Sequence, residues 1–488
     1  MRSSHIVACV CCCSCFLLVG CPTDAPDSGG VPRDTGQAVL ELAPDGGCTL
    51  DEAMFTSIAA APAAVATVIE VSWELEQAAA VRVLYTDAEG DAHATPAQPM
   101  GQAGATLLLG LPQQTDTTLR LVADQQGSQT CSGLLRATTG SLPPGLPILQ
   151  TSVPLPDEVE PGFLVTVVIP QRAAPWAAII DDKGRYVWAW SGALGGTRAR
   201  LSRDRRSMLL LNSYKEGSEY GAGVHRVALD GTMLAFHEAP EAWVDFAELP
   251  DGTLAVLVDD VRELSHQGEL RTIRGDAVVL VRPDGELVRL WSSFDASWPD
   301  LSTHYAFVTT ARGQEVEDWS HVNGIGMDRT GDILYLSAGA LNAIFAVDAG
   351  TGETLWELSA RSDDWLIQDP DPLVNAPHSV TPTPNGHLLV FNRMADAGAC
   401  SEVVEIALDS AAGSARRVWT GQSEDCLHVD FLGNAEPLPG GDTMISWSSM
   451  GRLEQLRPDG VTVRQISTQT ETFFGFAQPE ASLYPATP

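Results

Sequence analysis

Two histidines stand in matching positions relative to apolar, strand-like runs, and they are the first candidates for chemistry. His321 lies in DWSHVNGIGMD (318–328), and His378 lies in NAPHSVTPTPNGHLLVF (375–391). If these runs belong to neighbouring blades of a ring, both imidazoles reach the same mouth of its central channel. Two histidines placed in this way could exchange protons with a substrate, hold a metal ion, or only cap two strands.

Polar residues at the ends of the other apolar runs are further candidates, although a solvated channel requires polar residues there in any case. These strand ends supply Asn212, Tyr214, Asp259, Asp260, Ser337, Gly339, Asn392, Arg393, Ser448 and Ser449. His428, in CLHVDFLGNAEPLPGG, lies on an equivalent approach to the last run, but its phrase is less specific. We expect no metal and no cofactor, because the chain lacks a Walker loop, a GxSxG or HExxH motif, and any CxxC outside its first 21 residues.

A repeated phrase predicts the elements that position these residues. A turn rich in Pro, Asp, Asn and Gly leads into an apolar strand in LPDGTLAVL (249–257), RTGDILYL (329–336), TPNGHLLVF (383–391) and LPGGDTMISW (438–447). A second kind of hairpin, usually ending in an aromatic residue, alternates with it. Two hairpins per 45 to 80 residues are typical of four-stranded propeller blades. We count six blades in 157–488, with the strands after the repeated turns innermost and the ring closed by strands from both ends; seven blades is the alternative.

Composition agrees with an all-β protein and excludes one class of partner. The 488 residues include 44 Gly and 31 Pro and are 44% hydrophobic, which is too apolar for a disordered chain and too rich in turns for a helical one. Lys and Arg number 29 against 63 Asp and Glu, a formal net charge of −34. Such a surface repels phosphate backbones, so we expect no nucleic-acid partner.

The N-terminus predicts export and anchoring. An uncharged run follows Arg2 and closes with Leu18-Val19-Gly20-Cys21, which resembles a bacterial lipobox. The resemblance implies that residues 1–20 are a signal peptide and that Cys21 is lipidated, so that acyl chains anchor the chain in a membrane, periplasmic or cell-surface in location. An ordinary secretory signal with an incidental cysteine is the alternative.

Three segments lie between the predicted anchor and the propeller. Residues 21–37 are polar and rich in Pro, Gly and Asp, which predicts a flexible tether. Residues 38–141 contain short alternating strands such as TVIEVSW and VRVLY, which predict a β-sandwich that resembles a fibronectin type III module or is a generic sandwich. Residues 142–156 carry five prolines and predict a stiff linker.

Four cysteines remain after the leader and Cys21. Cys48 and Cys131 bracket the predicted sandwich, whereas Cys400 and Cys426 flank strands of one predicted blade. An oxidising compartment permits both disulfides, Cys48–Cys131 and Cys400–Cys426.

The phrases around the two histidines resemble the signature of the bacterial arylsulfotransferases (arylsulfate sulfotransferases). That signature is approximately DW-x-H-x-N-S-x-x-x-D, then S-S-R-H-Q-N-A-I, and later H-x-x-x-x-L-P-N-G. The resemblance implies a six-bladed propeller with an attached β-sandwich, and transfer of a sulfuryl group from a phenolic sulfate ester to a phenol without a cofactor. It implies that His378 is the sulfated nucleophile and that His321 is its partner. We expect Asn323, Arg393 and Tyr214 to contact the substrate.

Two departures from the signature leave an alternative open. The signature arginine falls on Gly339, which removes a cation expected to bind the sulfate oxygens, and Arg393 is a candidate replacement. A further family histidine falls near Trp243 or Val244. A catalytically inactive propeller lipoprotein, acting as a binding or scaffold module, is therefore the alternative to the enzyme. A polysaccharide-active or quinoprotein-like propeller would need paired carboxylates or repeated tryptophans at the channel, which we do not find.

Overall fold

The structure is a computed structural model that describes residues 47–485 except 193–194, 214–220, 303, 306–307, 312–313, 397 and 470. Nearly all regular structure in these residues is β-strand. The predicted signal peptide, tether and Cys21 lie outside the described residues, as does Tyr214. Within the described ranges, no helix has the length and apolar character needed to cross a membrane.

The N-terminal sheet curls around a single core, as the predicted β-sandwich requires. Its eight strands are β1 (Thr49–Leu50), β2 (Phe55–Pro62), β3 (Ile69–Thr86), β4 (Ala92–Ala94), β5 (Gln98–Leu108), β6 (Asp116–Gln125), β7 (Ser128–Cys131) and β8 (Leu135–Thr138). The long strand β3 pairs with β2 and β5 in its first half and with β6 and β4 in its second half. Alternate residues of β3, among them Ile69, Val71 and Trp73, are buried in this core.

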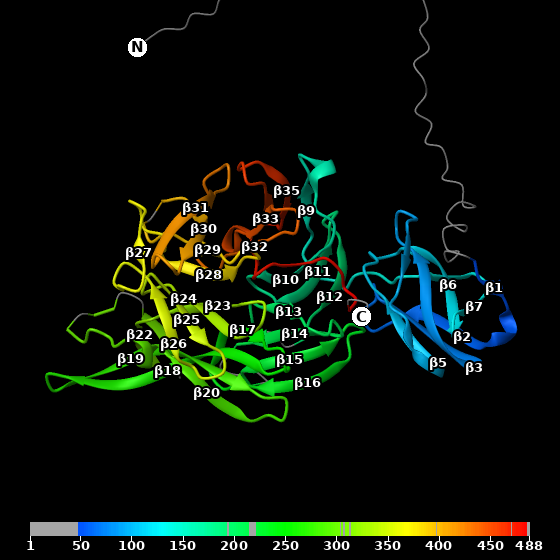
Figure 1. Ribbon diagram of the computed structural model, residues 1–488, viewed down its shortest axis with the longest axis horizontal. Coiled ribbons are helices and arrows are strands. Elements are labelled where there is room, and N and C mark those ends of the chain that lie inside the picture. The colour runs from blue at the N-terminus through cyan, green and yellow to red at the C-terminus, as the bar shows by residue number, and fades with distance from the viewer. Residues whose placement is uncertain are drawn as a thin grey trace, which may run out of the picture.

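Six sheets form the predicted six-bladed propeller (Figure 1). Blade 1 contains β10 (Phe163–Pro170), β11 (Trp176–Asp181), β12 (Tyr186–Trp190), β36 (Thr472–Phe474) and β37 (Gln478–Glu480). Blade 2 contains β13 (Ala199–Leu201), β14 (Ser207–Asn212), β15 (Gly223–Ala228) and β16 (Met233–Glu238). Blade 3 contains β17 (Ala242–Glu248), β18 (Leu254–His266), β19 (Glu269–Val281), β20 (Leu287–Ser292), β21 (Val308–Ala311) and β22 (Gln314–Asp318).

The remaining blades follow the same plan. Blade 4 contains β23 (Val322–Met327), β24 (Ile333–Ala338), β25 (Ala343–Asp348) and β26 (Thr354–Leu358). Blade 5 contains β27 (Leu366–Ile367), β28 (Pro377–Pro382), β29 (Leu388–Asn392), β30 (Glu402–Asp409) and β31 (Ser414–Gly421). Blade 6 contains β32 (Asn434–Pro437), β33 (Thr443–Ser446), β34 (Arg452–Leu456), β35 (Thr462–Ser467) and β9 (Gln150–Ser152).

The repeated turn joins the first two strands of a blade. In blade 3, Gly252 has φ +85°, and Asp251 Oδ1 accepts the Thr253 N–H at 2.9 Å. In blade 5, Gly386 occupies the same place with φ +83°. A left-handed residue at this point costs glycine little, which explains why each repeated phrase carries one.

The order of strands within a blade differs from our expectation. The cavity on the propeller axis is lined by β13, β17, β23, β28, β32 and β37, so these strands are innermost. The strands after the repeated turns, such as β24 and β29, are second in their blades. Their apolar runs are longer because they pack against neighbouring blades on both faces, whereas the axial strands mix polar and apolar residues. The sequence repeat is therefore most visible one strand away from the channel.

Strands from both ends of the propeller region close the ring. The C-terminal strands β36 and β37 pair with β10 in blade 1, and β9, from the segment predicted to be the linker, pairs with β35 in blade 6.

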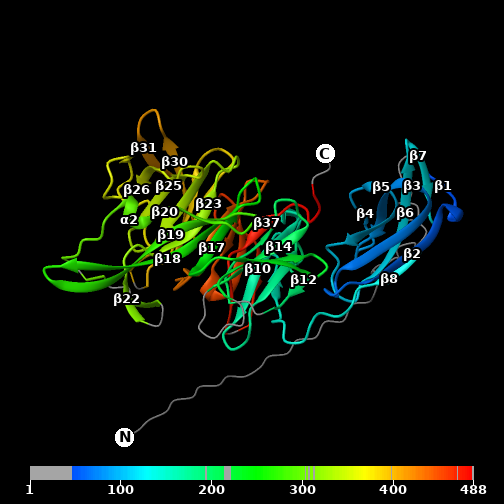
Figure 2. The same cartoon turned by 90° about the horizontal axis from the view of Figure 1, so that it is seen from below.

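The N-terminal sheet packs against the side of the propeller (Figures 1 and 2). Val65, Val68 and Leu109 share a core with residues of blades 1 and 2. The Tyr484 hydroxyl, near the C-terminus, accepts the Leu109 N–H at 2.9 Å and donates to the Leu107 carbonyl at 3.0 Å.

Candidate active site

One pocket of about 1080 Å³ brings together His321, His378 and Arg393. Apolar and aromatic residues from several blades form most of its wall: Ile169, Pro170, Pro175, Trp243, Val244, Phe431, Leu432 and Phe473. Arg172 also lines it, with a side chain that is 83% exposed. No carboxylate is among the described residues that line this pocket. A cationic pocket with aromatic walls, in a chain with 63 acidic residues, suits an anionic aromatic ligand.

His378 lies inside the innermost strand β28 and is only 4% exposed. Its Nδ1 donates to the Gly433 carbonyl at 3.2 Å, which leaves Nε2 as the nitrogen with a lone pair. The Phe476 ring lies 5.5 Å away, centroid to centroid. Burial lowers the pKa of His378 well below its ordinary value, and the charges of Arg393 and His321 act in the same direction. His378 is therefore a neutral imidazole at neutral pH.

His321 has different surroundings at the mouth of the adjacent blade. It precedes β23, has φ +48°, and donates from Nδ1 to Asp318 Oδ2 at 2.6 Å. Burial alone would raise the pKa of Asp318, but the hydrogen bond from His321 and the charge of Arg274 outweigh it, so the pKa lies below its usual value. The result is an ionised carboxylate that fixes the tautomer of the imidazole, as in a catalytic triad.

A buried arginine behind this pair holds it in place. Arg274 donates to Asp318 at 2.6 Å and to Asp259 at 2.6 Å, and its guanidinium lies 4.1 Å from the Trp243 ring centroid. The parallel pairing of β22 with β19 places Asp318 opposite Arg274. The Trp243 ring in turn meets His321 edge-on at 5.4 Å.

Asp276 fixes the backbone next to His321. It accepts the Val322 N–H at 2.7 Å and the Ser320 hydroxyl at 2.6 Å, on the two sides of this left-handed residue. Nothing in the DWSH phrase revealed Asp276, which lies 45 positions earlier in the sequence.

Arg393 follows β29 and reaches the pocket from blade 5. Its Nη1 donates to the Asp430 carbonyl at 2.8 Å, while its Nε has no partner among the described residues. Burial lowers the pKa of Arg393 below its ordinary value, and Asp430 opposes this shift. A guanidinium that is only partly satisfied inside a pocket has donors left for an oxyanion.

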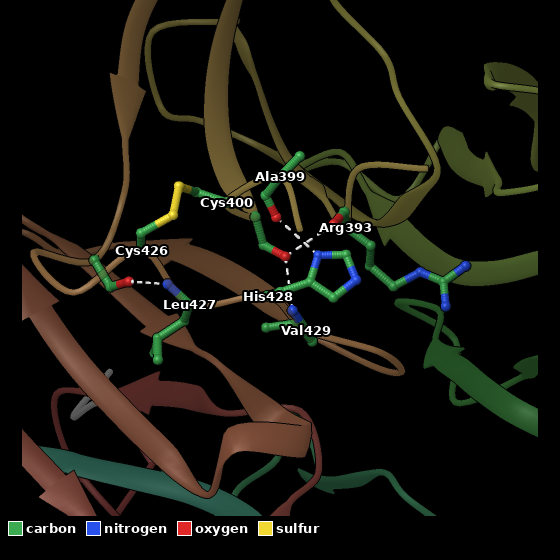
Figure 3. Close-up of a disulfide and its surroundings, with 9 residues drawn as sticks. Arg393, Ala399, Cys400, Cys426, Leu427, His428 and Val429 are labelled. Atoms are coloured by element: carbon green, nitrogen blue, oxygen red, sulfur yellow. Dashed lines mark hydrogen bonds between the residues drawn. A yellow bond between two sulfur atoms is a disulfide. The ribbon is translucent and has the colours of Figure 1, made fainter. Parts of the chain in front are cut away.

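The disulfide between Cys400 and Cys426 joins the two loops that hold Arg393 (Figure 3). The Ser401 hydroxyl donates to the Arg393 carbonyl at 2.9 Å and accepts the Val429 N–H at 2.9 Å. His428 donates from Nδ1 to the Ala399 carbonyl at 2.8 Å, so its contacts are structural. In Figure 3 the disulfide lies on one side of His428, and the Arg393 side chain extends on the other.

Both disulfides that the sequence suggested are present in the structure. The Cα atoms are 4.8 Å apart in Cys400–Cys426 and 5.7 Å apart in Cys48–Cys131, within the range of ordinary disulfides.

Asn323 and Gly339 lie behind the pocket. The Asn323 side chain is fully buried, donates to the Pro377 carbonyl at 3.0 Å and accepts the Ser337 hydroxyl at 2.8 Å, so it links blade 4 to the residue before His378. A Cβ on Gly339 would lie 2.9 Å from Asn323 Nδ2 and 3.3 Å from His321 Cδ2. The position that carries the signature arginine in the family thus has no space for a side chain here.

The aromatic wall of the pocket was not predicted from the sequence. Phe431 and Phe473 meet edge-on at 5.1 Å at the pocket, and Phe431 is 42% exposed. The only signal was that Phe431 belongs to the phrase around His428. Trp243, noted only as the place of a missing histidine, is part of the pocket wall.

Comparisons with known proteins give the family of the chain and similar solved structures. The sequence profile described as Arylsulfotransferase (ASST) matches residues 150–476. No curated protein matches the chain significantly. Solved structures that resemble it include a protein of unknown function from Bacteroides caccae, at 17% identity and a TM-score of 0.40, covering 66% of this chain and 100% of that chain. A periplasmic gluconolactonase from Pseudomonas aeruginosa has 13% identity and a TM-score of 0.34, with 67% and 100% covered. A catalytically inactive virginiamycin B lyase variant from Staphylococcus aureus has 10% identity and a TM-score of 0.35, with 67% and 98% covered.

Within the parts of the chain that the structure describes, no group of three His, Cys, Asp or Glu side chains could hold a metal ion. The chemistry derived below uses only the protein's own side chains.

Proposed function

The chain belongs to the arylsulfotransferase family, and from this premise we propose that it moves a sulfuryl group from a phenolic sulfate ester to a phenol through a sulfohistidine at His378. One observation carries the proposal: the pocket combines a desolvated neutral imidazole, a carboxylate-held imidazole and an arginine, with aromatic walls and no carboxylate among the described residues that line it.

The first half-reaction forms the sulfohistidine. The Nε2 lone pair of His378 attacks the sulfur of the aryl sulfate, a nitrogen–sulfur bond forms, and the bond from sulfur to the phenolic oxygen breaks. Protonated His321 gives its Nε2 proton to the departing phenolate. Asp318 keeps the proton on Nδ1 of His321, so that only Nε2 exchanges protons.

The second half-reaction reverses these bonds with a different phenol. Neutral His321 takes the proton of the acceptor hydroxyl, the phenolic oxygen attacks the sulfur, and the nitrogen–sulfur bond breaks. His378 returns to its neutral form and His321 to its protonated form. Each atom and proton is accounted for without a cofactor.

Arg393 supports the charge that gathers on the sulfuryl oxygens. In the transition state these oxygens are negative, and a fixed donor aimed at them stabilises this charge. Gly339 has no space for the signature arginine, whereas Arg393 lines the same pocket as both histidines. We therefore propose that Arg393 binds the sulfuryl oxygens in place of the signature arginine.

Turnover of a chromogenic aryl sulfate, measured with and without added phenol, tests the proposed function. We expect phenol-dependent release of the coloured phenolate with ping-pong kinetics, and a sulfated peptide containing His378 when the acceptor is omitted. The His304→Ala variant, in which the altered side chain is 78% exposed, serves as a matched histidine control and should behave like the wild type. A wild-type protein inert toward a panel of aryl sulfates would favour the inactive binding module, which Gly339 also supports.

We also propose that the mature protein is an exported lipoprotein anchored through Cys21. The support is the lipobox-like sequence and the polar segment after it. Mass spectrometry of the exported protein should find Cys21 at the N-terminus, lipidated through its thioether and acylated on its amine. An unmodified Cys21, or cleavage elsewhere, contradicts this proposal.

A further inference from the structure

A second, smaller cavity lies on the propeller axis and plays no part in the reaction described above. Its volume is about 210 Å³, and the innermost strands line it. Phe476 lines this cavity, and its ring centroid lies 5.5 Å from that of His378, so the cavity lies close to the proposed nucleophile. We call it the channel cavity.

Arg198 is the notable side chain of the channel cavity. It is 3% exposed, and its Nε and Nη1 have no hydrogen-bond partner among the described residues. Nε forms an ion pair with Asp245 Oδ1 at 3.2 Å, without the geometry of a hydrogen bond, and the guanidinium stacks on Phe476 at 4.5 Å. Burial and the charge of Arg200 lower the pKa of Arg198 to about 10, so it remains charged at neutral pH. A buried guanidinium with unused donors is costly unless a ligand satisfies it.

The carboxylates near Arg198 are largely committed elsewhere. Asp245 accepts the Phe246 N–H at 2.8 Å, the Ile325 N–H at 2.9 Å and the Arg200 guanidinium at 3.3 Å. Burial raises the pKa of Glu436, which favours its uncharged form despite the two nearby arginines. Arg200 itself donates to the Phe246 and Ile325 carbonyls.

A second unused donor lines the channel cavity from another blade. Ser379 is 5% exposed, and its hydroxyl has no partner among the described residues. Arg198 precedes β13 in blade 2, whereas Ser379 follows His378 in β28 of blade 5. Two unsatisfied donors from separate blades thus line one small space.

We propose that the channel cavity binds a small oxyanion of the sulfate, phosphate or carboxylate class, with Arg198 and Ser379 as its donors. The shared chemistry of these ligands is a compact group of negatively charged oxygens that accepts several hydrogen bonds. This site does not depend on the proposed function, because neither donor takes part in sulfuryl transfer.

Crystals grown without sulfate or phosphate and then soaked in selenate locate the site directly. We expect an anomalous selenium peak within hydrogen-bonding distance of Arg198 and Ser379. A peak at His378 and Arg393 would belong to the active-site pocket, so the two sites are told apart by position. Ordered water in the channel cavity with no selenium peak there overturns the proposal.

Calorimetric titration of the full mature chain with sulfate, phosphate or acetate at constant ionic strength measures the affinity. The Arg393→Met substitution is included throughout so that the active-site pocket does not contribute. Adding Arg198→Met should weaken the affinity for the preferred anion at least about tenfold, because a hydrogen bond to a charged group is lost. Arg206→Met, at an exposed position outside the cavity, is the matched control and should leave the affinity unchanged.

The Ser379→Ala variant tests the same site if the Arg198→Met protein does not fold. It removes one hydroxyl from the channel cavity, and we expect the anion affinity to fall several-fold while circular dichroism and the melting temperature stay close to those of the parent. Unchanged affinity in both the Ser379→Ala and the Arg198→Met proteins contradicts the proposed site.

Discussion

The two histidines stand at matching ends of the innermost strands of adjacent blades, but their surroundings have little in common. His321 donates to a carboxylate that is itself held by a buried arginine. His378 donates to a backbone carbonyl and is nearly inaccessible to water. The same fold therefore places the imidazole of His321 beside a charged carboxylate and buries the imidazole of His378 away from water.

This difference suits two different tasks. A carboxylate at Nδ1 stabilises the positive charge that develops when Nε2 accepts a proton, which is what an acid–base group requires. Desolvation keeps His378 uncharged and its lone pair available, which is what a nucleophile requires. Pairs of titratable groups in contrasting environments are a common way to divide acid–base and nucleophilic roles.

Removing His378 gives the largest expected effect. In His378→Ala no atom can carry the sulfuryl group, so turnover of an aryl sulfate should fall to the background rate and the sulfated peptide should disappear. The fold should persist, because β28 keeps its backbone pairing with β29. Full activity in this variant refutes the sulfohistidine mechanism, and a lost melting transition would require the milder His378→Gln.

Removing His321 gives a smaller effect, because the nucleophile remains. We expect His321→Ala to slow transfer by roughly 10²- to 10⁴-fold, the usual contribution of a positioned acid or base. The transfer rate should fall least for sulfate esters of very acidic phenols, because their phenolates leave without a proton. Equal losses for acidic and weakly acidic leaving groups would contradict the role of His321 as general acid.

Replacing Arg393 tests the difference between the two histidines through the pH dependence of kcat/KM. Losing one oxyanion donor should cost about 10²- to 10³-fold in rate. Because Arg393 also helps to lower the pKa of His378, Arg393→Met should raise that pKa. Protonated His378 is inactive, so the acid limb of kcat/KM, which we expect well below pH 6.5 in the wild type, should move to higher pH.

Arg172 provides the matched control for Arg393. It lines the same pocket, but its side chain is 83% exposed and 3.6 Å from Glu471. Arg172→Met should therefore change the rate less and leave the acid limb in place. If both arginine variants shift the acid limb equally, the influence of Arg393 on His378 is not specific.

The contrast between the histidines was only partly predictable from the sequence. The repeated turn phrases predicted six blades, and the position of each histidine before such a phrase predicted that both reach the channel. The innermost strands were misassigned, because the repeat is strongest in the second strand of each blade. The phrase DWSH contains Asp318, but Arg274 and Asp276 lie some 40 positions away and meet it only through the pairing of β19 with β22.

The residues around His378 could not be predicted from the sequence for a similar reason. Gly433, which fixes the tautomer of His378, and Phe431, which forms the aromatic wall, both follow Cys426 in a loop without a repeat. Such loops are placed by contacts between distant segments, which no local pattern reports. The Gly339 departure was visible in the sequence, whereas the crowding around that glycine required the structure.

The two disulfides should differ in what they affect, one mainly the stability of the fold and the other the position of active-site residues. Their removal gives the smallest expected change in rate. Cys48–Cys131 closes 83 residues and Cys400–Cys426 closes 26, so in the chain-entropy model their removal costs about 4.5 and about 3.5 kcal/mol of unfolding free energy. Paired Cys→Ser variants, unfolded in urea, should therefore show the larger stability loss for Cys48–Cys131.

The rate of sulfuryl transfer should show the opposite order, with the larger loss in the variant that lacks Cys400–Cys426. Cys426 begins the loop whose Asp430 carbonyl holds Arg393 and whose Gly433 carbonyl holds His378, whereas Cys48–Cys131 lies in the N-terminal sheet, far from the pocket. Because those hydrogen bonds can re-form in the unlinked loop, the loss of rate should stay below the ~10²-fold that a 1 Å misplacement can cost. Equal rates in the two serine variants would show that the loop holds its position without the disulfide.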